Sequence, residues 1–518
     1  MRRYAFWLGA VVVVAGVLMH VPDFVSARGD GFMMAGMPMG RVMSVGMGLI
    51  FVGLALGTWG LLPGRAERAA RARRVPAARF AALEEAPLNR AHRTLVVVLT
   101  VGLVVDTMKP ASLGFVTPGM AAEYGISTHE AASLPFVAIT GTVIGSVVWG
   151  YLADLFGRRS TIMLSALLYV ATSICGFMPS FGWNLVMCFL MGAAAGGMLP
   201  TVYSLMSESV PSRHRGWLLV LQSGLGTTLG YLIASGAASV LVPLLSWRVM
   251  WLLNIPTGLL LVALSRWIPE SPRFLMACGR DDEAATVMAR YGVRAVPAAT
   301  PPPAVAVPVA APRIPALFGS LYRLRTAGIL LYGLGWGVVN WGFVTFLPVF
   351  LAAAGVGTGA SRLLFLSSLF AVPATAVAAV LYARWSSRRS MLTYSVGTVA
   401  VLVLFAVLSP QRPGSGTLLV VLVSVLLAGL GGMIAMLSPY AAEVYPTTLR
   451  ATGSGVAAAS SKIGGMLGPL LITSTIGIDT LALVCAAPVA VAAVLLWRTG
   501  QETSGRPMVE TPAFEGEG

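Results

Sequence analysis

Charged residues are scarce in this chain of 518 residues. Only 11% of the residues are Asp, Glu, Lys or Arg, whereas 57% are hydrophobic and the mean hydropathy is +0.81. This composition excludes a soluble globular domain of such length, whose surface needs a larger charged fraction. The chain is therefore predicted to be an all-α protein of a lipid bilayer.

Cysteine is also rare. The four cysteines, Cys175, Cys188, Cys278 and Cys485, show no paired spacing and form no CxxC sequence. The spacing therefore indicates neither a disulfide framework nor a cysteine redox site.

Signals of enzymatic chemistry are missing. The sequence has no nucleophile placed with a base, no phosphate-binding loop and no glycine-rich dinucleotide turn. We therefore predict a protein that is not an enzyme and uses no cofactor.

A cluster of methionines leaves a Cu(I)-handling role open as an alternative, since thioether sulfur is a soft ligand. Its members are Met33, Met34, Met37, Met39, Met43 and Met47. Methionine is also an ordinary packing residue, so no metal site is predicted.

Long hydrophobic runs are abundant. Fourteen of them reach the length of about 20 residues that a bilayer-spanning helix needs. The linkers between them divide the chain as follows: 1–64, two accessory spans; 65–94, a basic linker; 95–268, six spans; 269–325, a central loop; 326–498, six spans; and 499–518, a polar tail predicted to be disordered. The first span follows Arg2 and Arg3, so a cleaved signal peptide is an alternative to a retained helix.

The positive charge follows the predicted spans. The formal net charge is +15, and the arginines cluster in alternate loops. This distribution fits the positive-inside rule better than a nucleic-acid surface, so no nucleic-acid partner is predicted. It places both termini in the cytoplasm of a multi-pass protein of the cytoplasmic (inner) cell membrane.

The two groups of six spans carry a repeated polar pattern. Glu208, Pro211 and Arg215 recur as Glu443, Pro446 and Arg450, each at the offset 443 − 208 = 235. An offset shared by a helix end and the loop after it predicts two similar halves, as in many secondary transporters.

Two loop sequences resemble those of a known family. The first runs from Gly150 to Arg159 as GYLADLFGRR, and the second is PESPRFL at 269–275. Both resemble the major facilitator superfamily, in particular its sugar-porter, organic-ion and metabolite:proton symporter branch. The resemblance implies a core of twelve helices in two six-helix halves that functions as a monomer.

The resemblance also implies a cytoplasmic gate. Its residues would be Gly150, Asp154, Gly157, Arg158 and Arg159, with Asp154 holding cations of neighbouring segments. We expect two further gating pairs at the repeated pattern: Glu208 with Arg213 or Arg215, and Glu443 with Arg450. In the second half Arg384 replaces the aspartate and Ser387 replaces the second glycine, so that loop lacks its acidic partner.

Three charges fall deep within predicted spans, where an ionisable group costs several kcal/mol unless it faces protein or water. They are Asp106, Lys109 and Lys462, and we predict that all three face a central cavity. No acidic residue lies within one helical turn of Lys462 in the sequence, which favours an anionic substrate. Asp106 and Lys109 could alternatively form a pair that only stabilises their helix.

These charges predict proton-coupled symport of a small organic anion, such as an aromatic or other monocarboxylate. Protonation of Asp106 would release Lys109 to join Lys462 on the anion. Trp336, Asn340 and Trp341 are further candidates for substrate contacts. A proton-coupled exporter of drugs or metabolites and a sugar porter are the alternatives. Two lysines disfavour cations, and sugar sites generally rely on neutral polar side chains.

Overall fold

A computed structural model describes most of the chain. The described residues are 2–61, 86–278, 280–293, 314–320, 322–353, 359–408, 416–445, 447–471 and 477–503. Some side chains within these ranges, those of Asp154 and Arg450 among them, lie outside the description. The described residues form helices and no strand, which confirms the all-α prediction.

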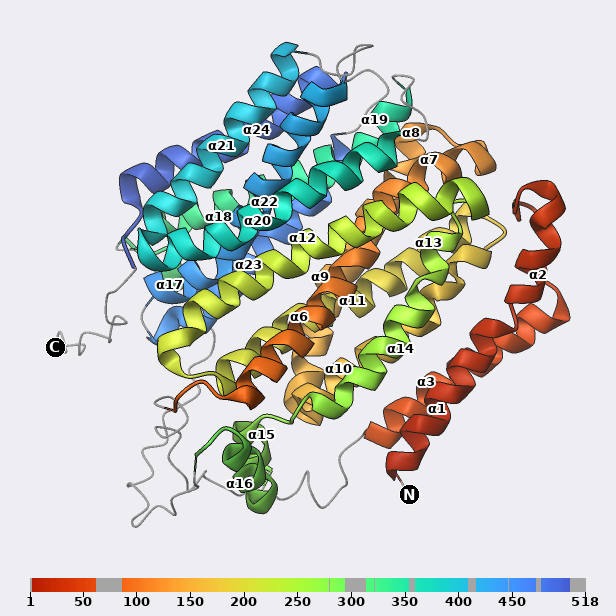
Figure 1. Ribbon diagram of the computed structural model, residues 1–518, viewed down its shortest axis with the longest axis horizontal. Coiled ribbons are helices and arrows are strands. Elements are labelled where there is room, and N and C mark those ends of the chain that lie inside the picture. The colour runs from red at the N-terminus through yellow and green to blue at the C-terminus, as the bar shows by residue number, and fades with distance from the viewer. Residues whose placement is uncertain are drawn as a thin grey trace. The chain divides into compact units, whose positions relative to one another are not determined.

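The helices are named in chain order (Figure 1). The accessory segment contains α1 (Arg2–Leu18), α2 (Val21–Ser26), the 3-10 helix η1 (Ala27–Asp30) and α3 (Arg41–Leu61). The next group contains α6 (Arg90–Ala111), α7 (Leu113–Tyr124), α8 (Thr128–Ala131), α9 (Ser133–Phe156), α10 (Arg158–Ala171), the 3-10 helix η2 (Thr172–Phe177), α11 (Phe181–Ser209), α12 (Ser212–Leu245), α13 (Val249–Leu252), α14 (Asn254–Leu264) and the 3-10 helix η3 (Ser265–Trp267).

The central loop and the last group complete the chain. The loop contributes α15 (Pro272–Ala277), α16 (Asp281–Arg290) and α17 (Ile314–Leu317). The last group contains α18 (Arg323–Val338), the π-helix η4 (Val339–Val344), α19 (Leu347–Ala353), α20 (Gly359–Arg384), α21 (Ser387–Leu408), α22 (Gly416–Val444), α23 (Thr447–Leu470) and α24 (Ile478–Thr499).

Thirteen helical segments in the described ranges are long and apolar enough to cross a membrane. The sequence also predicts a span over about 451–477, which overlaps α23, but this helix is not among the thirteen. This helix is rich in glycine and serine and carries Lys462, which lowers its hydropathy. This helix therefore holds one of the predicted site residues.

The chain divides into two compact units. The first unit contains Met1–Arg215, Leu229–Ala304 and Leu351–Phe365, and the second contains Gly216–Thr228, Val305–Phe350 and Leu366–Gly518. Each predicted six-span half lies mainly in one unit. Most of the N-terminal half of α12 is assigned to the second unit, and the segment around the start of α20 to the first.

Glycines allow close packing inside each unit. In the second unit, α23 packs on α18 and η4 so closely that a Cβ at Gly337 or Gly464 would meet backbone atoms of the opposite helix. Helices in lipid associate through such small residues, because apolar side chains gain little by leaving lipid. Glycine packing thus fixes Lys462 on a helix adjacent to Asn340.

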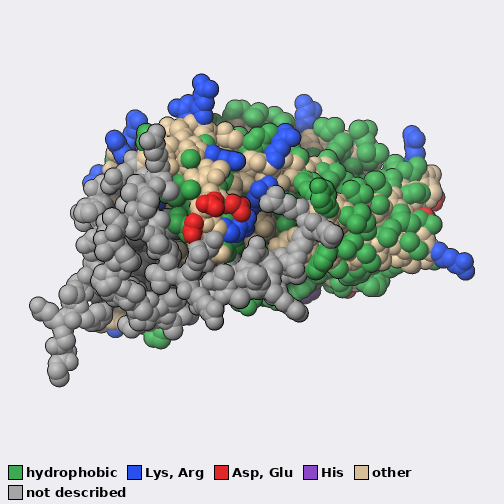
Figure 2. Space-filling view, turned by 90° about the horizontal axis from the view of Figure 1, so that it is seen from below, with side chains coloured by type: hydrophobic (Ala, Val, Ile, Leu, Met, Phe, Trp, Pro, Cys, Tyr) green, Lys and Arg blue, Asp and Glu red, His purple; other side chains and the backbone are tan. Residues whose placement is uncertain are grey.

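The accessory helices α1 and α3 form a hairpin (Figure 1). This hairpin packs against α10 in the first unit. Its outer side carries exposed hydrophobic side chains, including Tyr4, Val11, Phe51 and Trp59. In Figure 2 the side of the molecule on which the hairpin lies is covered mainly by hydrophobic side chains. This surface is suited to contact with lipid.

Candidate functional site

Asp106 and Lys109 lie on one face of α6, and both side chains are almost completely buried, with exposed fractions of 6% and 1%. The hydroxyl of Tyr169 on α10 donates a hydrogen bond of 2.7 Å to Oδ1 of Asp106. Nζ of Lys109 donates to the carbonyl oxygen of Tyr169 at 3.0 Å and to the hydroxyl of Thr172. Tyr169 therefore contacts both charged residues, and we call these four residues the coupling cluster.

The sequence predicts one span over about 95–117, and the structure has one candidate span, Arg90–Tyr124, that is divided into two helices after Lys109. Proline at 110 has no N–H, and the helix gives way at Ser112 to a second segment, α7. Lys109 is therefore in the last turn of α6, where the carbonyl ends of a helix favour a cation.

Lys109 also lies over the ring of Tyr169, with Nζ 4.3 Å from the ring centroid. Such a contact stabilises a cation that has lost water. The lysine thus has three kinds of neutral partner: a carbonyl oxygen, a hydroxyl and an aromatic face. Its predicted direct role at the substrate remains a prediction.

The second unit holds the other predicted binding residues. Lys462 is partly buried on α23. Asn340 and Trp341 are in η4, a π-helical stretch within a longer span, and such stretches occur frequently at functional sites. Nε1 of Trp336 donates to the carbonyl of Leu430 on α22 at 3.0 Å, so this indole also fixes helix packing.

The signature loop of the first unit is held by Glu270 of the central loop. Oε1 of Glu270 accepts hydrogen bonds from the backbone N–H groups of Arg158 at 2.7 Å and Ser271 at 3.0 Å. Partial burial raises the pKa of Glu270, and these hydrogen bonds oppose that shift. A carboxylate at this position satisfies the free N–H groups at the start of α10. The two sequences that carried the family resemblance therefore meet in one cluster.

Arg158 connects this cluster to α11. Its Nη2 lies 3.0 Å from Oε1 of Glu208, and its Nη1 donates to the carbonyl of Ala153 at 3.3 Å. The structure places Arg158 at Glu208, and the pairing of Glu208 with Arg213 or Arg215 stays a prediction. The predicted contacts of Asp154 fall on a side chain outside the described residues. Gly150 lies within α9, and Arg159 donates its backbone N–H to Glu270 at 3.4 Å.

Replacement of Gly157 by alanine should lower stability by on the order of 1–3 kcal/mol. Gly157 has φ 96° and ψ 160°, a conformation that only glycine adopts easily, and an added Cβ would lie against the Glu270 carboxylate. Thermal unfolding of the purified protein in detergent would measure the change. Gly150→Ala is the matched control, because apart from the neighbouring backbone of its own helix no described atom lies within 4 Å of the added carbon. Equal effects of the two substitutions would contradict this account of the loop.

The second unit has a corresponding cluster that the sequence did not reveal. Oε1 of Glu502, just after α24, accepts from the backbone N–H of Ser387 at 2.9 Å and from its hydroxyl at 2.7 Å. Glu270 follows the last span of the first half, and the offsets 502 − 270 = 232 and 387 − 157 = 230 are close to the repeat. Glu502 thus caps α21 as Glu270 caps α10.

Residues 501–503 correct the prediction of a disordered tail from 499 onward. The hydroxyl of Thr503 donates to Oε2 of Glu443 at 2.6 Å, and Gln501 shares two hydrogen bonds with the hydroxyl of Tyr440. Glu443 also accepts from the hydroxyl of Tyr382 at 2.7 Å. Its predicted partner, Arg450, has a side chain outside the described residues.

Comparison with known proteins identifies the family of this fold. Residues 98–469 and 363–513 match the model of the Major Facilitator Superfamily, and the accessory hairpin precedes the matched part. The niacin transporter NiaP of Acinetobacter baylyi is 26% identical over 440 residues, covering 82% of this chain and 98% of that protein. The 4-hydroxybenzoate transporter PcaK of the same organism is 26% identical over 430 residues, covering 80% and 93%.

Solved structures agree in fold. The xylose transporter XylE from E. coli, in a partially occluded inward open conformation, aligns with a TM-score of 0.64 and 14% identity, covering 81% of this chain and all of that one. At this identity the likeness concerns the fold alone.

Proposed function

We propose a specific transport reaction for this chain, which belongs to the Major Facilitator Superfamily and is a multi-pass membrane transporter. The reaction is proton-coupled symport of a small aromatic monocarboxylate by alternating access. The chain would act as a monomer in the cytoplasmic membrane, with both termini in the cytoplasm.

The coupling cluster is the observation that carries this proposal. It contains one acidic and one basic side chain, both buried within a span and joined through Tyr169. Buried ionisable groups are costly in a membrane, and transporters use them as proton relays. Asp106 can take up a proton while its other oxygen still accepts from Tyr169.

Protonation of Asp106 changes the local charge. With Asp106 ionised, its charge and that of Lys109 cancel, and after protonation the coupling cluster carries a net charge of +1. The extra positive charge favours binding of a carboxylate, so proton and anion binding assist each other. Release of the proton on the cytoplasmic side would then weaken the anion's hold.

Two observations favour an aromatic acid as the substrate. The relatives NiaP and PcaK are named for niacin and 4-hydroxybenzoate, which are both aromatic carboxylic acids. In this chain, Trp341 and Asn340 are in the π-helical segment of the second unit, whose helix packs beside that of Lys462. We assign the carboxylate to Lys462 and the ring to this segment.

The two clusters in which Glu270 caps α10 and Glu502 caps α21 would serve as cytoplasmic gates, each within its own unit. In the first unit Arg158 joins the backbone of the signature loop to Glu208, and in the second unit Glu502 joins the segment after α24 to α21. Charge-assisted hydrogen bonds at helix ends break and reform when helices move.

Uptake into proteoliposomes tests the proposal. Purified protein should accumulate 4-hydroxybenzoate or niacin when the external medium is more acidic than the lumen, and a protonophore that collapses the pH gradient should stop this accumulation. Protein-free liposomes control for passive entry of the protonated acid. Uptake of xylose instead would establish a sugar porter, and exchange of a lipophilic cation for protons would establish an exporter.

A further inference from the structure

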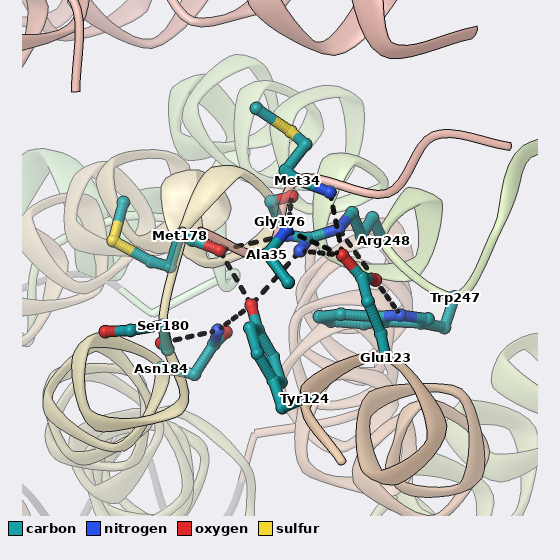
Figure 3. A network of polar contacts seen from close by, with 10 residues as sticks. All are labelled: Met34, Ala35, Glu123, Tyr124, Gly176, Met178, Ser180, Asn184, Trp247 and Arg248. Carbon is teal, nitrogen blue, oxygen red and sulfur yellow. Dashed lines mark hydrogen bonds and ion pairs between the residues drawn. The ribbon is translucent and has the colours of Figure 1, made fainter. Parts of the chain in front are cut away.

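A buried ion pair between Glu123 and Arg248 lies beside η2, which follows the end of α10, whereas the signature loop precedes its start; Figure 3 shows the contacts of the pair. Nη2 of Arg248 is 2.6 Å from Oε1 of Glu123, and Nε is 3.2 Å from Oε2. The side chains have exposed fractions of 0% and 4%. Such a pair is stable only when further hydrogen bonds satisfy both groups, because both charges have left water.

The accessory hairpin supplies part of those hydrogen bonds. The backbone N–H groups of Met34 and Ala35 donate to Oε1 of Glu123 at 2.7 Å and 3.0 Å. Nε1 of Trp247 donates to the other oxygen at 2.9 Å. With the two bonds from Arg248, the carboxylate accepts five N–H groups, so both of its oxygens are fully hydrogen-bonded. The loop between η1 and α3, which we call the hairpin loop, is therefore hydrogen-bonded to a charged side chain of the first unit. The hairpin thus does more than contact lipid.

Arg248 transmits this attachment to η2. Its Nη1 donates to the carbonyl oxygens of Gly176 at 3.0 Å and Met178 at 3.1 Å. The hairpin also contacts the same segment directly, since the ring of Phe177 lies 5.5 Å from that of His20 and 5.9 Å from that of Phe24.

The segment η2 begins with Thr172, whose hydroxyl accepts a hydrogen bond from Lys109. This segment of six residues, two turns of 3-10 helix, therefore contacts the coupling cluster at its first residue and the hairpin at its last residue. Helix α10, which presents Tyr169 to the cluster, packs against α1 and α3 of the hairpin.

We propose that the accessory hairpin is a clamp that positions the coupling cluster. Glu123 and Arg248 act as positioning residues: they fix the hairpin loop and η2 together, so that Thr172 and Tyr169 stay in hydrogen-bond reach of Lys109 and Asp106. This inference rests on the proposed proton-coupling role of Asp106. The hairpin precedes the part of the chain that matches the family model, so the clamp is an addition to the common core.

Ala35→Pro tests the clamp at a single atom, because proline has no N–H to donate to Glu123. Ala35→Ser is the matched control, since it keeps the N–H and the side chain at this position is exposed. Hydrogen exchange of peptides covering η2 should be about tenfold faster in the proline variant than in the serine variant. Glu123→Gln, which keeps an acceptor oxygen but removes its charge, should act in the same direction.

The pH profile of uptake separates positioning from simple stabilisation. The titratable groups near Lys109 in the described structure are Asp106, Tyr169, Cys175 and Cys188, and loss of Thr172 and Tyr169 from their places changes the surroundings of Asp106. The midpoint of the profile should therefore shift by about half a pH unit in Ala35→Pro and stay unchanged in Ala35→Ser.

Each failure has a separate signature. Unchanged exchange of η2 in both Ala35→Pro and Glu123→Gln would overturn the clamp, and so would faster exchange with an unchanged pH profile. Uptake by the native chain that does not respond to pH would overturn the proposed coupling, and with it the positioning role. The native measurement therefore distinguishes the two hypotheses.

Discussion

Replacing Lys462 by alanine should reduce the affinity for an aromatic monocarboxylate by roughly 100-fold, the effect of removing one partner of a desolvated charge pair. The lysine is the only Lys or Arg in the described part of α23 from residue 453 onward, and this helix lies beside the π-helical segment with Asn340. Thermal stabilisation by 4-hydroxybenzoate and by niacin measures the loss, because a ligand that binds the folded state raises its apparent stability.

Lys462→Arg is the matched control, since it keeps the positive charge on a side chain of similar length. It should retain most of the stabilisation by carboxylates. The melting temperature of each variant without ligand separates loss of binding from loss of folding. If Lys462→Ala unfolds as the native protein does and still binds the acids equally well, the anion site lies elsewhere. Stabilisation by lipophilic cations alone would favour the exporter.

Replacing Asp106 by asparagine should abolish accumulation driven by a pH gradient and leave exchange of substrate across the membrane intact. One proton per monocarboxylate makes the symport electroneutral, so a gradient of one pH unit can drive about tenfold accumulation. Asparagine has nearly the same shape and an oxygen that can accept from Tyr169, whose hydroxyl lies 2.7 Å from Oδ1 of the native residue. It cannot take up a proton in this pH range.

Proteoliposomes loaded with substrate measure both activities of the Asp106→Asn variant. Net accumulation under an imposed pH gradient should fall to the level without a gradient, and counterflow exchange should persist. Tyr169→Phe provides a second comparison: it removes the hydroxyl but leaves the titratable carboxylate, so accumulation should persist with a changed pH profile. Continued pH-driven accumulation by Asp106→Asn would show that another group carries the proton.

Several site features were accessible from the sequence because they depend on position within one helix. A charge inside a long apolar run stands out through its cost in lipid, which identified Asp106, Lys109 and Lys462. The loop from Gly150 to Arg159 stood out through its spacing. No comparable signal marked Tyr169 or Thr172, because a tyrosine or threonine in an apolar helix is common and its partner is about sixty residues away.

Glu270 and Glu502 show the same limit in the two halves. Glu270 was part of a recognised loop sequence, but its attachment to the start of α10 appears only when the two loops are brought together. Glu502 stands in a short polar tail whose composition predicts disorder. Glu502 follows Glu270 by 232 residues, close to the repeat offset of 235, and this spacing could have identified Glu502 as its counterpart. The signal is weak, because the sequence around the two glutamates is otherwise little repeated.

By itself the sequence determined that this chain lies in a bilayer, that its spans fall into two related halves after an accessory pair, and that three charges lie deep within spans. These features follow from local composition, because the cost of placing a polar group in lipid depends little on distant residues. The tertiary structure decided which side chains meet: Tyr169 between Asp106 and Lys109, and Glu123 between the hairpin loop and Arg248. Those contacts depend on how each helix is rotated and packed against helices far away in the chain, and the pattern within one helix does not contain that information.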